Sequence, residues 1–181
     1  MKILLIVALL TGLNANSSTL TKVSEPGVTN KTLPGYDFDS DQVFKINTGP
    51  LQNATIFFAF KAPGKLDVIP RFVVVKGGVL LDSIEIPTLE LGWNIVSVQA
   101  LSAEAVTMSE SITAFAILTI EPISGRESDY WDQGFIFTIT KDGKIDPQKN
   151  INLKIAQTKP AIKNIKALKA YLKINSTLLK R

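Results

Sequence analysis

The sequence of 181 residues contains no cysteine and no histidine. The missing cysteines exclude disulfide bonds, thiolate metal sites and thiol nucleophiles, and the missing histidines exclude imidazole ligands and Ser-His or Cys-His catalysis. Carboxylate pairs can still cleave glycosidic bonds, but nothing in the sequence singles out such a pair. We therefore predict that the protein is not an enzyme and that it holds no cofactor.

One unbroken apolar run lies at the N-terminus. Met1 and Lys2 are followed by apolar residues 3–10 and then by small and polar residues through Ser17. A single positive charge, a short apolar stretch and a small-x-small site are typical of a secretory signal peptide. We interpret residues 1–17 as a signal peptide, or else as a retained hydrophobic arm. The run is shorter than the about 20 residues needed to cross a bilayer, so we predict no transmembrane segment.

The middle of the chain has the pattern of a mainly β protein. Between about residues 42 and 155, short runs rich in Val, Ile, Phe and Thr alternate with turn signals such as Gly77-Gly78 and Asp142-Gly143. We expect one helical turn within 103–111. The pattern predicts an antiparallel β-sandwich or jelly roll of about eight strands. The predicted strands are 42–46, 54–61, 67–75, 79–86, 94–101, 113–120, 135–140 and 151–156.

The sandwich domain is expected to span 36–157. Residues 18–35 are mostly polar and end at Pro34-Gly35, which predicts a flexible N-terminal arm before the domain. Residues 158–181 are expected to form a C-terminal tail.

The charge of the chain is divided unevenly between the body and the tail. Nine basic and no acidic residues follow Asp146, whereas the rest of the chain has 11 basic and 16 acidic residues. Apolar residues at 162, 165, 168 and 172 recur at helical spacing, and lysines follow one position later. Thr158 is expected to cap this helix and Pro160 to lie in its first turn. The tail is therefore predicted to be a basic amphipathic helix.

Three interpretations of this helix remain open. Its apolar side docks on the sandwich, or it docks on another subunit or protein partner, or its lysines contact an anionic surface. Nucleic acid is the least favoured anionic partner, because Tyr171 is the only aromatic residue and Arg181 the only arginine in the tail. The candidate contact residues are Lys159, Lys163, Lys166, Lys169 and Lys173.

Two acidic segments are candidate ligand sites. Asp37, Asp39 and Asp41 have a spacing that can place three carboxylates around calcium, although the glycine and glutamate of an EF-hand loop are missing. The alternative is a solvated acidic loop.

A second segment contains rings and carboxylates of the kind that hold sugars, or else its aromatic residues cover the end of the core. Its residues are Asp129, Tyr130, Trp131 and Asp132.

The sequence predicts a non-enzymatic exported protein with a structural or adhesive role. We expect it to be a subunit of a surface assembly, filament or virus particle, located in the secreted, cell-surface or extracellular-particle fraction. Sandwich proteins serve this use because edge strands and terminal arms can pair with neighbours. The alternative is a secreted carbohydrate-binding module that uses Tyr130 and Trp131.

Overall fold

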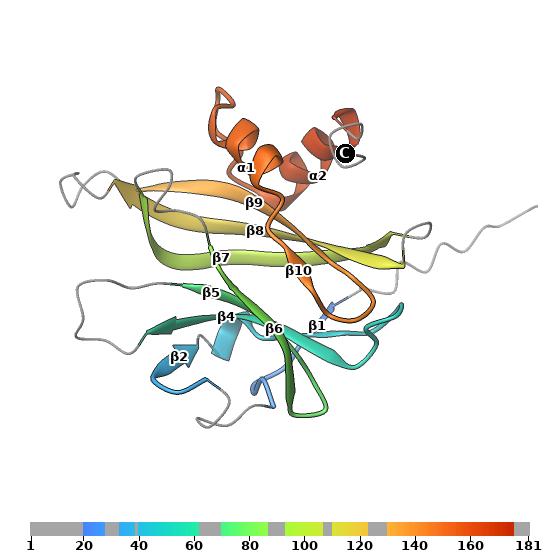
Figure 1. Cartoon of the computed structure of the whole chain (residues 1–181). Helices are drawn as coiled ribbons and strands as arrows, with labels where there is room; N and C mark the ends of the chain where they lie inside the picture. The colour runs from blue at the N-terminus through green and yellow to red at the C-terminus, as the bar shows by residue number, and fades with distance from the viewer. Residues whose placement is uncertain are drawn as a thin grey trace, which may run out of the picture.

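The computed structural model describes residues 20–27, 33–38, 40–61, 70–86, 93–106, 110–122 and 130–175. Within these ranges the chain forms two antiparallel sheets that face each other, with two helices packed on the outer side of one sheet (Figure 1). The arrangement confirms the prediction of a mainly β, sandwich-like protein with a C-terminal helix.

The first sheet, sheet A, has the order β1-β3-β4-β5-β6, and β2 also pairs with β4. Its strands are β1 (Leu20–Lys22), β2 (Tyr36–Phe38), β3 (Phe44–Ile46), β4 (Ala54–Lys61), β5 (Arg71–Lys76) and β6 (Val79–Glu85). A short 3-10 helix, η1 (Ser40–Gln42), precedes β3. Gly77 and Gly78, both with positive φ, form the β5–β6 hairpin as predicted.

The second sheet, sheet B, has the order β10-β9-β8-β7. Its strands are β7 (Trp93–Val106), β8 (Ser111–Pro122), β9 (Trp131–Ile139) and β10 (Ile145–Asp146). The predicted turn at Asp142-Gly143 joins β9 to β10, where the Gly143 amide donates to the Thr140 carbonyl at 2.9 Å. Two helices follow, α1 (Lys149–Ala156) and α2 (Ile165–Ile174).

The main core lies between the two sheets and is centred on three aromatic rings. Phe58 of β4, Phe72 of β5 and Phe137 of β9 are fully buried. The ring centroids of Phe72 and Phe137 lie 4.6 Å apart in a stacked arrangement, and those of Phe58 and Phe72 lie 5.1 Å apart. Contacts of this kind add to the burial of apolar area and join the two sheets.

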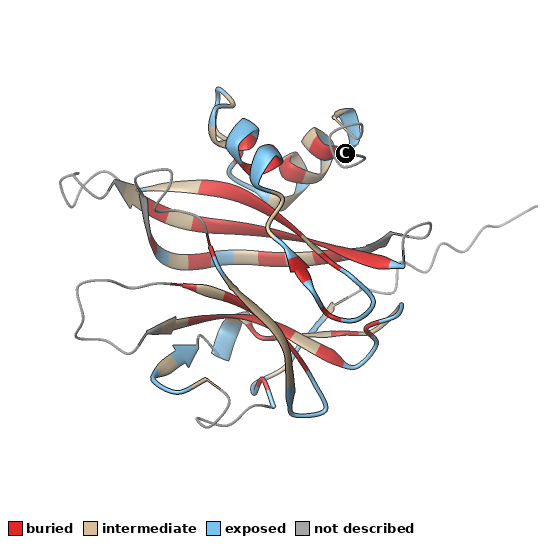
Figure 2. Ribbon diagram, viewed as in Figure 1, coloured by how far each residue is buried: buried red, intermediate tan, exposed pale blue. Residues whose placement is uncertain are grey.

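A second apolar cluster lies on the opposite face of sheet B. Figure 2 shows buried residues on the sides of α1 and α2 that face this sheet. Because strand side chains alternate between faces, Phe115 and Ile117 of β8 and Ile136 of β9 point toward the helices, while their neighbours point into the main core. The residues of the two helices and of the link between them that cover this face are Ile151, Ile155, Ile162, Leu168 and Leu172.

A third, smaller cluster lies on the outer face of sheet A. Val43, Phe57 and Val73 are fully buried there. The residues that pack against them include Val23 and Leu33, which precede the predicted start of the domain. Sheet A is therefore partly covered by the beginning of the described chain.

Several local predictions differ from the structure. Residues 151–156, predicted as a strand, belong to α1, so two helices rather than one follow the sandwich. The expected helical turn within 103–111 is wrong where the chain is described, because β7 continues to Val106 and β8 begins at Ser111. Part of the predicted arm is β1, which pairs with β3 and joins sheet A.

The start of the C-terminal helix also differs. Thr158 and Pro160 lie in the link between the helices, and α2 begins at Ile165 with Asn164 as its N-cap. The Asn164 side-chain oxygen accepts a hydrogen bond from the Ala167 amide at 2.9 Å. This bond satisfies one of the amides that a helix start leaves without a partner.

Candidate functional site

The helices form an outer layer that is fixed to sheet B by both polar and apolar contacts. The side chain of Asn152 in α1 is buried, and its oxygen accepts from the Ile136 amide at 2.8 Å while its nitrogen donates to the Ile136 carbonyl at 2.9 Å. In α2, Leu168 lies over Gly134 so closely that a Cβ on the glycine would be 2.9 Å from a Leu168 methyl group. The layer therefore has a defined position on the sheet.

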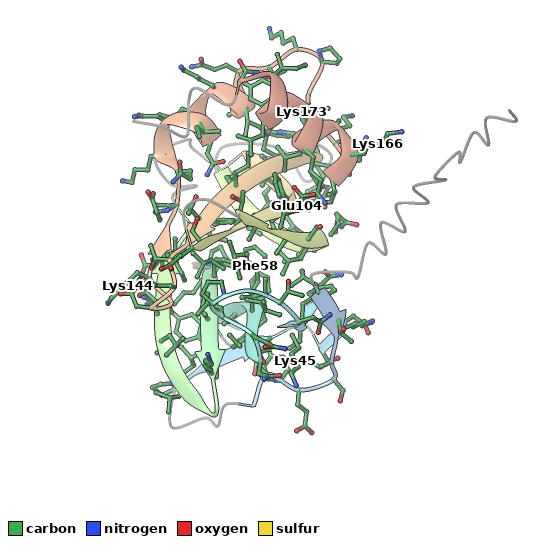
Figure 3. The ribbon with its side chains drawn as sticks, turned by 90° about the vertical axis from the view of Figure 1, so that its right-hand side faces the viewer. Lys45, Phe58, Glu104, Lys144, Lys166 and Lys173 are labelled. Atoms are coloured by element: carbon green, nitrogen blue, oxygen red, sulfur yellow. The ribbon has the colours of Figure 1, made fainter. Side chains whose placement is uncertain are left out.

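This layer carries a strong positive charge. Residues 147–175 contain seven lysines and no acidic residue. Figure 3 shows Lys166 and Lys173 on the outer side of the layer, away from sheet B. We define the lysine face as the exposed lysines of α1, α2 and the link between them that form no ion pair within the described ranges. They are Lys154, Lys159, Lys163, Lys166 and Lys173.

Lys169 differs from the other lysines of the predicted stripe. Its Nζ lies 2.9 Å from the Glu104 Oε1 on β7, and it is also 5.4 Å from the ring centroid of Phe115. The Lys169 side chain is 32% exposed. Lys169 therefore helps to hold α2 on the sheet, and the apolar side of α2 docks on the sandwich, as the first of the three interpretations predicted.

The predicted sugar-binding segment does not converge on one surface where it is described. Trp131 packs against the main core, whereas Asp132 on the opposite face of β9 accepts a hydrogen bond from the Thr119 hydroxyl at 2.9 Å. Tyr130 is 49% exposed. Asp129 lies outside the described residues. Trp131 and Asp132 therefore do not form a shared binding edge, and ring stacking would have to rely on Tyr130.

The predicted calcium residues are only partly described. Asp37 lies exposed on β2, and Asp39 is outside the described residues. Asp41 Oδ1 lies 2.7 Å from Lys22 Nζ, and this hydrogen-bonded lysine lowers the pKa of Asp41 below its ordinary value. Across the described ranges no group of three or more acidic side chains is placed to hold a metal ion. The calcium site stays a prediction.

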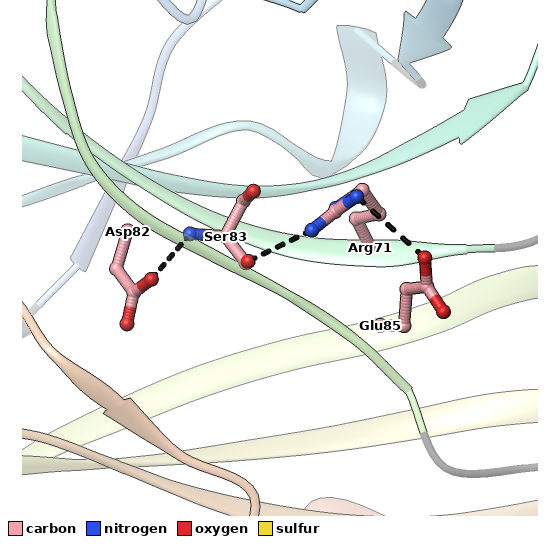
Figure 4. Close-up of polar contacts among 4 residues, drawn as sticks. All are labelled: Arg71, Asp82, Ser83 and Glu85. Carbon is pink, nitrogen blue, oxygen red and sulfur yellow. Dashed lines mark hydrogen bonds and ion pairs between the residues drawn. The ribbon is translucent and has the colours of Figure 1, made fainter.

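A polar network lies at the ends of β5 and β6 (Figure 4). Arg71 Nη2 donates to the Ser83 carbonyl at 3.1 Å, and Arg71 Nη1 lies 3.6 Å from Glu85 Oε1. One carboxylate oxygen of Asp82 accepts from the Ser83 amide, and the other accepts from the Ile145 amide of β10 at 2.8 Å. Asp82 therefore links sheet A to sheet B, which is a structural role.

The edge of sheet B formed by β7 was not recognised as a candidate surface from the sequence. β7 is 14 residues long and pairs with β8 on one side. Within the described part of the chain, no backbone bond joins its other side to a strand or loop. One signal was present in the sequence, since residues 93–106 contain a single charged residue, Glu104, and no proline.

β7 is regular in its second half and irregular in its first half. The register with β8 shifts between Ile95 and Ser97 and again between Val98 and Ala100. From Leu101 to Val106 the pairing is continuous. The second half is therefore the part of the edge that can accept another strand without distortion.

Comparison with protein families, curated proteins and solved structures found no match to this chain. Neither helix in the described ranges combines the length and the apolar character needed to span a membrane.

Proposed function

We propose that the protein is a non-enzymatic, exported structural protein, a subunit that joins a neighbouring copy through the open edge of β7. The observation that carries this proposal is the length and composition of that edge. Strands are usually about five or six residues long, and exposed edges are normally shortened or protected by lysine, proline or bulges. β7 has 14 residues, and its regular second half contains neither lysine nor proline.

A second copy of the same chain is the partner that fits this edge. Two identical strands can pair antiparallel about a two-fold axis, which gives a closed and self-complementary interface. An axis near Ser102 places each Glu104 opposite Ala100 of the other copy and keeps the two carboxylates apart. On the helix side of the sheet the side chains nearest to such an axis, Ser102 and Ala100, are small, so they leave room for the second strand at normal strand spacing.

The proposal differs from the second interpretation of the tail, in which the basic helix docks on another subunit. The apolar side of α2 is already buried against sheet B of its own chain. Removing the tail would uncover Phe115, Ile117 and Ile136, and the loss of the fold would then be confused with the loss of assembly. The test is therefore better made by substitutions on the strands.

Light scattering of residues 18–181 with a lysine at one position of sheet B tests the proposal. Ser102→Lys places two like charges opposite each other in the paired edge, which disfavours pairing. Thr138→Lys is the matched control, because Thr138 is also half-buried on the helix side of the sheet, but on β9, which pairs on both sides. We expect a multiple of the chain mass for the parent protein and the control, and a single-chain mass for Ser102→Lys.

Two outcomes would contradict the proposal. One is a parent protein that has the mass of a single chain over the whole accessible concentration range. The other is an assembly that survives Ser102→Lys as well as it survives Thr138→Lys, with both variants folded by circular dichroism.

Export is the second part of the proposal and depends on the sequence of residues 1–17, which lie outside the described residues. Intact mass of the natural protein tests it, since cleavage after Ser17 predicts a chain that begins at Ser18. A natural protein that retains Met1 would favour the hydrophobic arm instead.

A further inference from the structure

The outer side of the helical layer combines the lysine face with two exposed apolar side chains. Leu153 of α1 is 40% exposed and Ile174 of α2 is 83% exposed. Leu153 lies on the side of α1 opposite the buried Ile151 and Ile155, and Lys154 follows it directly. Ile174 directly follows Lys173 near the end of α2. Charge and exposed apolar area therefore occur together on this layer.

The chemistry of the layer favours a diffuse anionic surface over a ligand with fixed geometry. Residues 147–175 contain no arginine, which is the side chain that binds carboxylates and phosphates through two parallel hydrogen bonds. Their only aromatic ring, that of Tyr171, packs against the cluster beneath the helices. The layer therefore lacks the exposed rings on which sugars and bases stack.

Lysines act in this setting as separate point charges on flexible stems. A charge of this kind gains about 1 kcal/mol near an anionic membrane surface without a specific partner atom. Long apolar side chains between the charges can enter the boundary between headgroups and acyl chains. A layer with lysines around exposed leucine and isoleucine side chains has both properties.

We propose that the helical layer binds to the surface of a lipid bilayer that contains anionic lipids. The lysine face contacts the headgroups, and Leu153 and Ile174 enter the headgroup boundary. The docked sides of α1 and α2 stay on sheet B, because Ile155 and Leu168 are fully buried there. The sandwich would then lie above the membrane with sheet A farthest from it (Figure 1). This binding does not depend on pairing through β7.

Vesicle sedimentation with the full chain beginning at Ser18 tests the proposal. The probes are vesicles of phosphatidylcholine and phosphatidylserine in equal amounts, and vesicles of phosphatidylcholine alone. The variant Lys166→Gln, Lys173→Gln removes two charges from the lysine face. The matched control is Lys76→Gln, Lys144→Gln, which removes two exposed lysines outside the helical layer and leaves the same net charge (Figure 3 shows Lys144).

We expect the parent protein to bind the anionic vesicles and not the neutral ones. Each lysine near the membrane surface raises the affinity for anionic vesicles about fivefold, so the variant without Lys166 and Lys173 should bind about 25-fold more weakly than the parent. The affinity of the control variant should stay within about twofold of the parent. Binding should also fall as salt is raised, because exposed charges are screened. Light scattering of each variant shows whether a change of assembly contributes to the loss.

A second pair of variants separates the membrane from other polyanions. Ile174→Ser should weaken vesicle binding, whereas Val79→Ser, which removes another exposed apolar side chain at the β5–β6 hairpin, should not. Absence of binding to anionic vesicles would overturn the proposal, and so would an equal loss in the two lysine variants. Binding to an acidic polysaccharide or to DNA, but not to vesicles, would also overturn it.

Discussion

The backbone groups at the two lateral edges of sheet B are bonded differently. On one side β9 pairs with β10 for two residues, and beyond that point the Asn152 side chain bonds both backbone groups of Ile136. The outer side of β10 is also satisfied, because the Ile145 amide donates to Asp82 of the other sheet. On the other side β7 has no such partner within the described ranges.

The difference shows that side chains can satisfy the backbone groups at one edge of a sheet, while the backbone groups at the other edge stay free to pair with another strand. A buried backbone group without a partner costs about 1–3 kcal/mol, so the β10 edge needs Asn152 and Asp82 for stability. The β7 edge can stay open only where water or another strand reaches it. Substitutions at the β10 edge should therefore change the stability of a single chain, and those at the β7 edge should change association.

The largest loss of stability is expected for Asn152→Leu. The leucine has a similar size but leaves the amide and carbonyl of Ile136 buried without partners, which should lower the free energy of unfolding by about 4 kcal/mol. Asn150→Leu is the control, because Asn150 is exposed on the same helix and should change stability by less than about 0.5 kcal/mol. Urea unfolding measures both, and similar values for the two variants would show that Asn152 does not close the edge.

Gly143→Ala should have the next largest effect, through the turn that leads into β10. Gly143 has φ of 87°, and a Cβ there would lie 2.6 Å from a Leu81 methyl group. Backbone strain and crowding together should cost about 3 kcal/mol. Gly77 also has positive φ but has open space around it, so Gly77→Ala should cost about 1 kcal/mol. Thermal unfolding that ranks the two variants the other way round would contradict this account of the turn.

A smaller loss of stability is expected for Asp82→Ala, which removes the hydrogen bond that the Asp82 carboxylate accepts from the Ile145 amide of β10. The carboxylate is half-buried and bonds two amides, so the cost should be about 1.5 kcal/mol. Glu85→Ala on the same strand removes an exposed and long ion pair and should cost at most about 0.5 kcal/mol. Hydrogen exchange at the Ile145 amide should accelerate in Asp82→Ala alone. Unchanged exchange would mean that the link is not formed in solution.

The smallest effect is a pH dependence in the β9–β10 turn. The Thr140 hydroxyl donates to the Asp142 carboxylate, and this bond lowers the pKa of Asp142 below its ordinary value of 3.8. Because the pKa is lowered in the folded state, the stabilisation is present above the unfolded value and is lost as the pH falls through the folded one. A carboxyl titration followed by NMR should give a midpoint below 3.8, and Thr140→Val should raise it. A midpoint that Thr140→Val leaves unchanged would refute the assignment.

The sequence predicted the regular parts of the sandwich well, because local signals determine them. The predicted strand 54–61 has the bounds of β4, and the hairpins at Gly77-Gly78 and Asp142-Gly143 follow from turn chemistry. The strand predicted at 151–156 failed for a physical reason. Its apolar residues fit both alternation and a helical pair at 151 and 155, and in the structure that pair is buried against sheet B beside the contact between Asn152 and Ile136.

The candidate surfaces were predictable only in part. Counting charges locates the basic tail, but Lys169 is separated from the lysine face by Glu104, which is 65 positions away in the chain. Likewise, a run with one charge is visible at 93–106, but the strand order decides whether such a run becomes an edge or a central strand. Both facts belong to the tertiary structure.

The cluster beneath the helices also sets an order of events during synthesis. Strands β8 and β9 complete an apolar face with Phe115, Ile117 and Ile136, but the residues that cover it, from Ile151 to Leu172, leave the ribosome afterwards. A growing chain therefore carries an uncovered apolar patch until Leu172 has been added. A chain without α2 would leave this face of sheet B uncovered, so α2 protects the growing chain against aggregation.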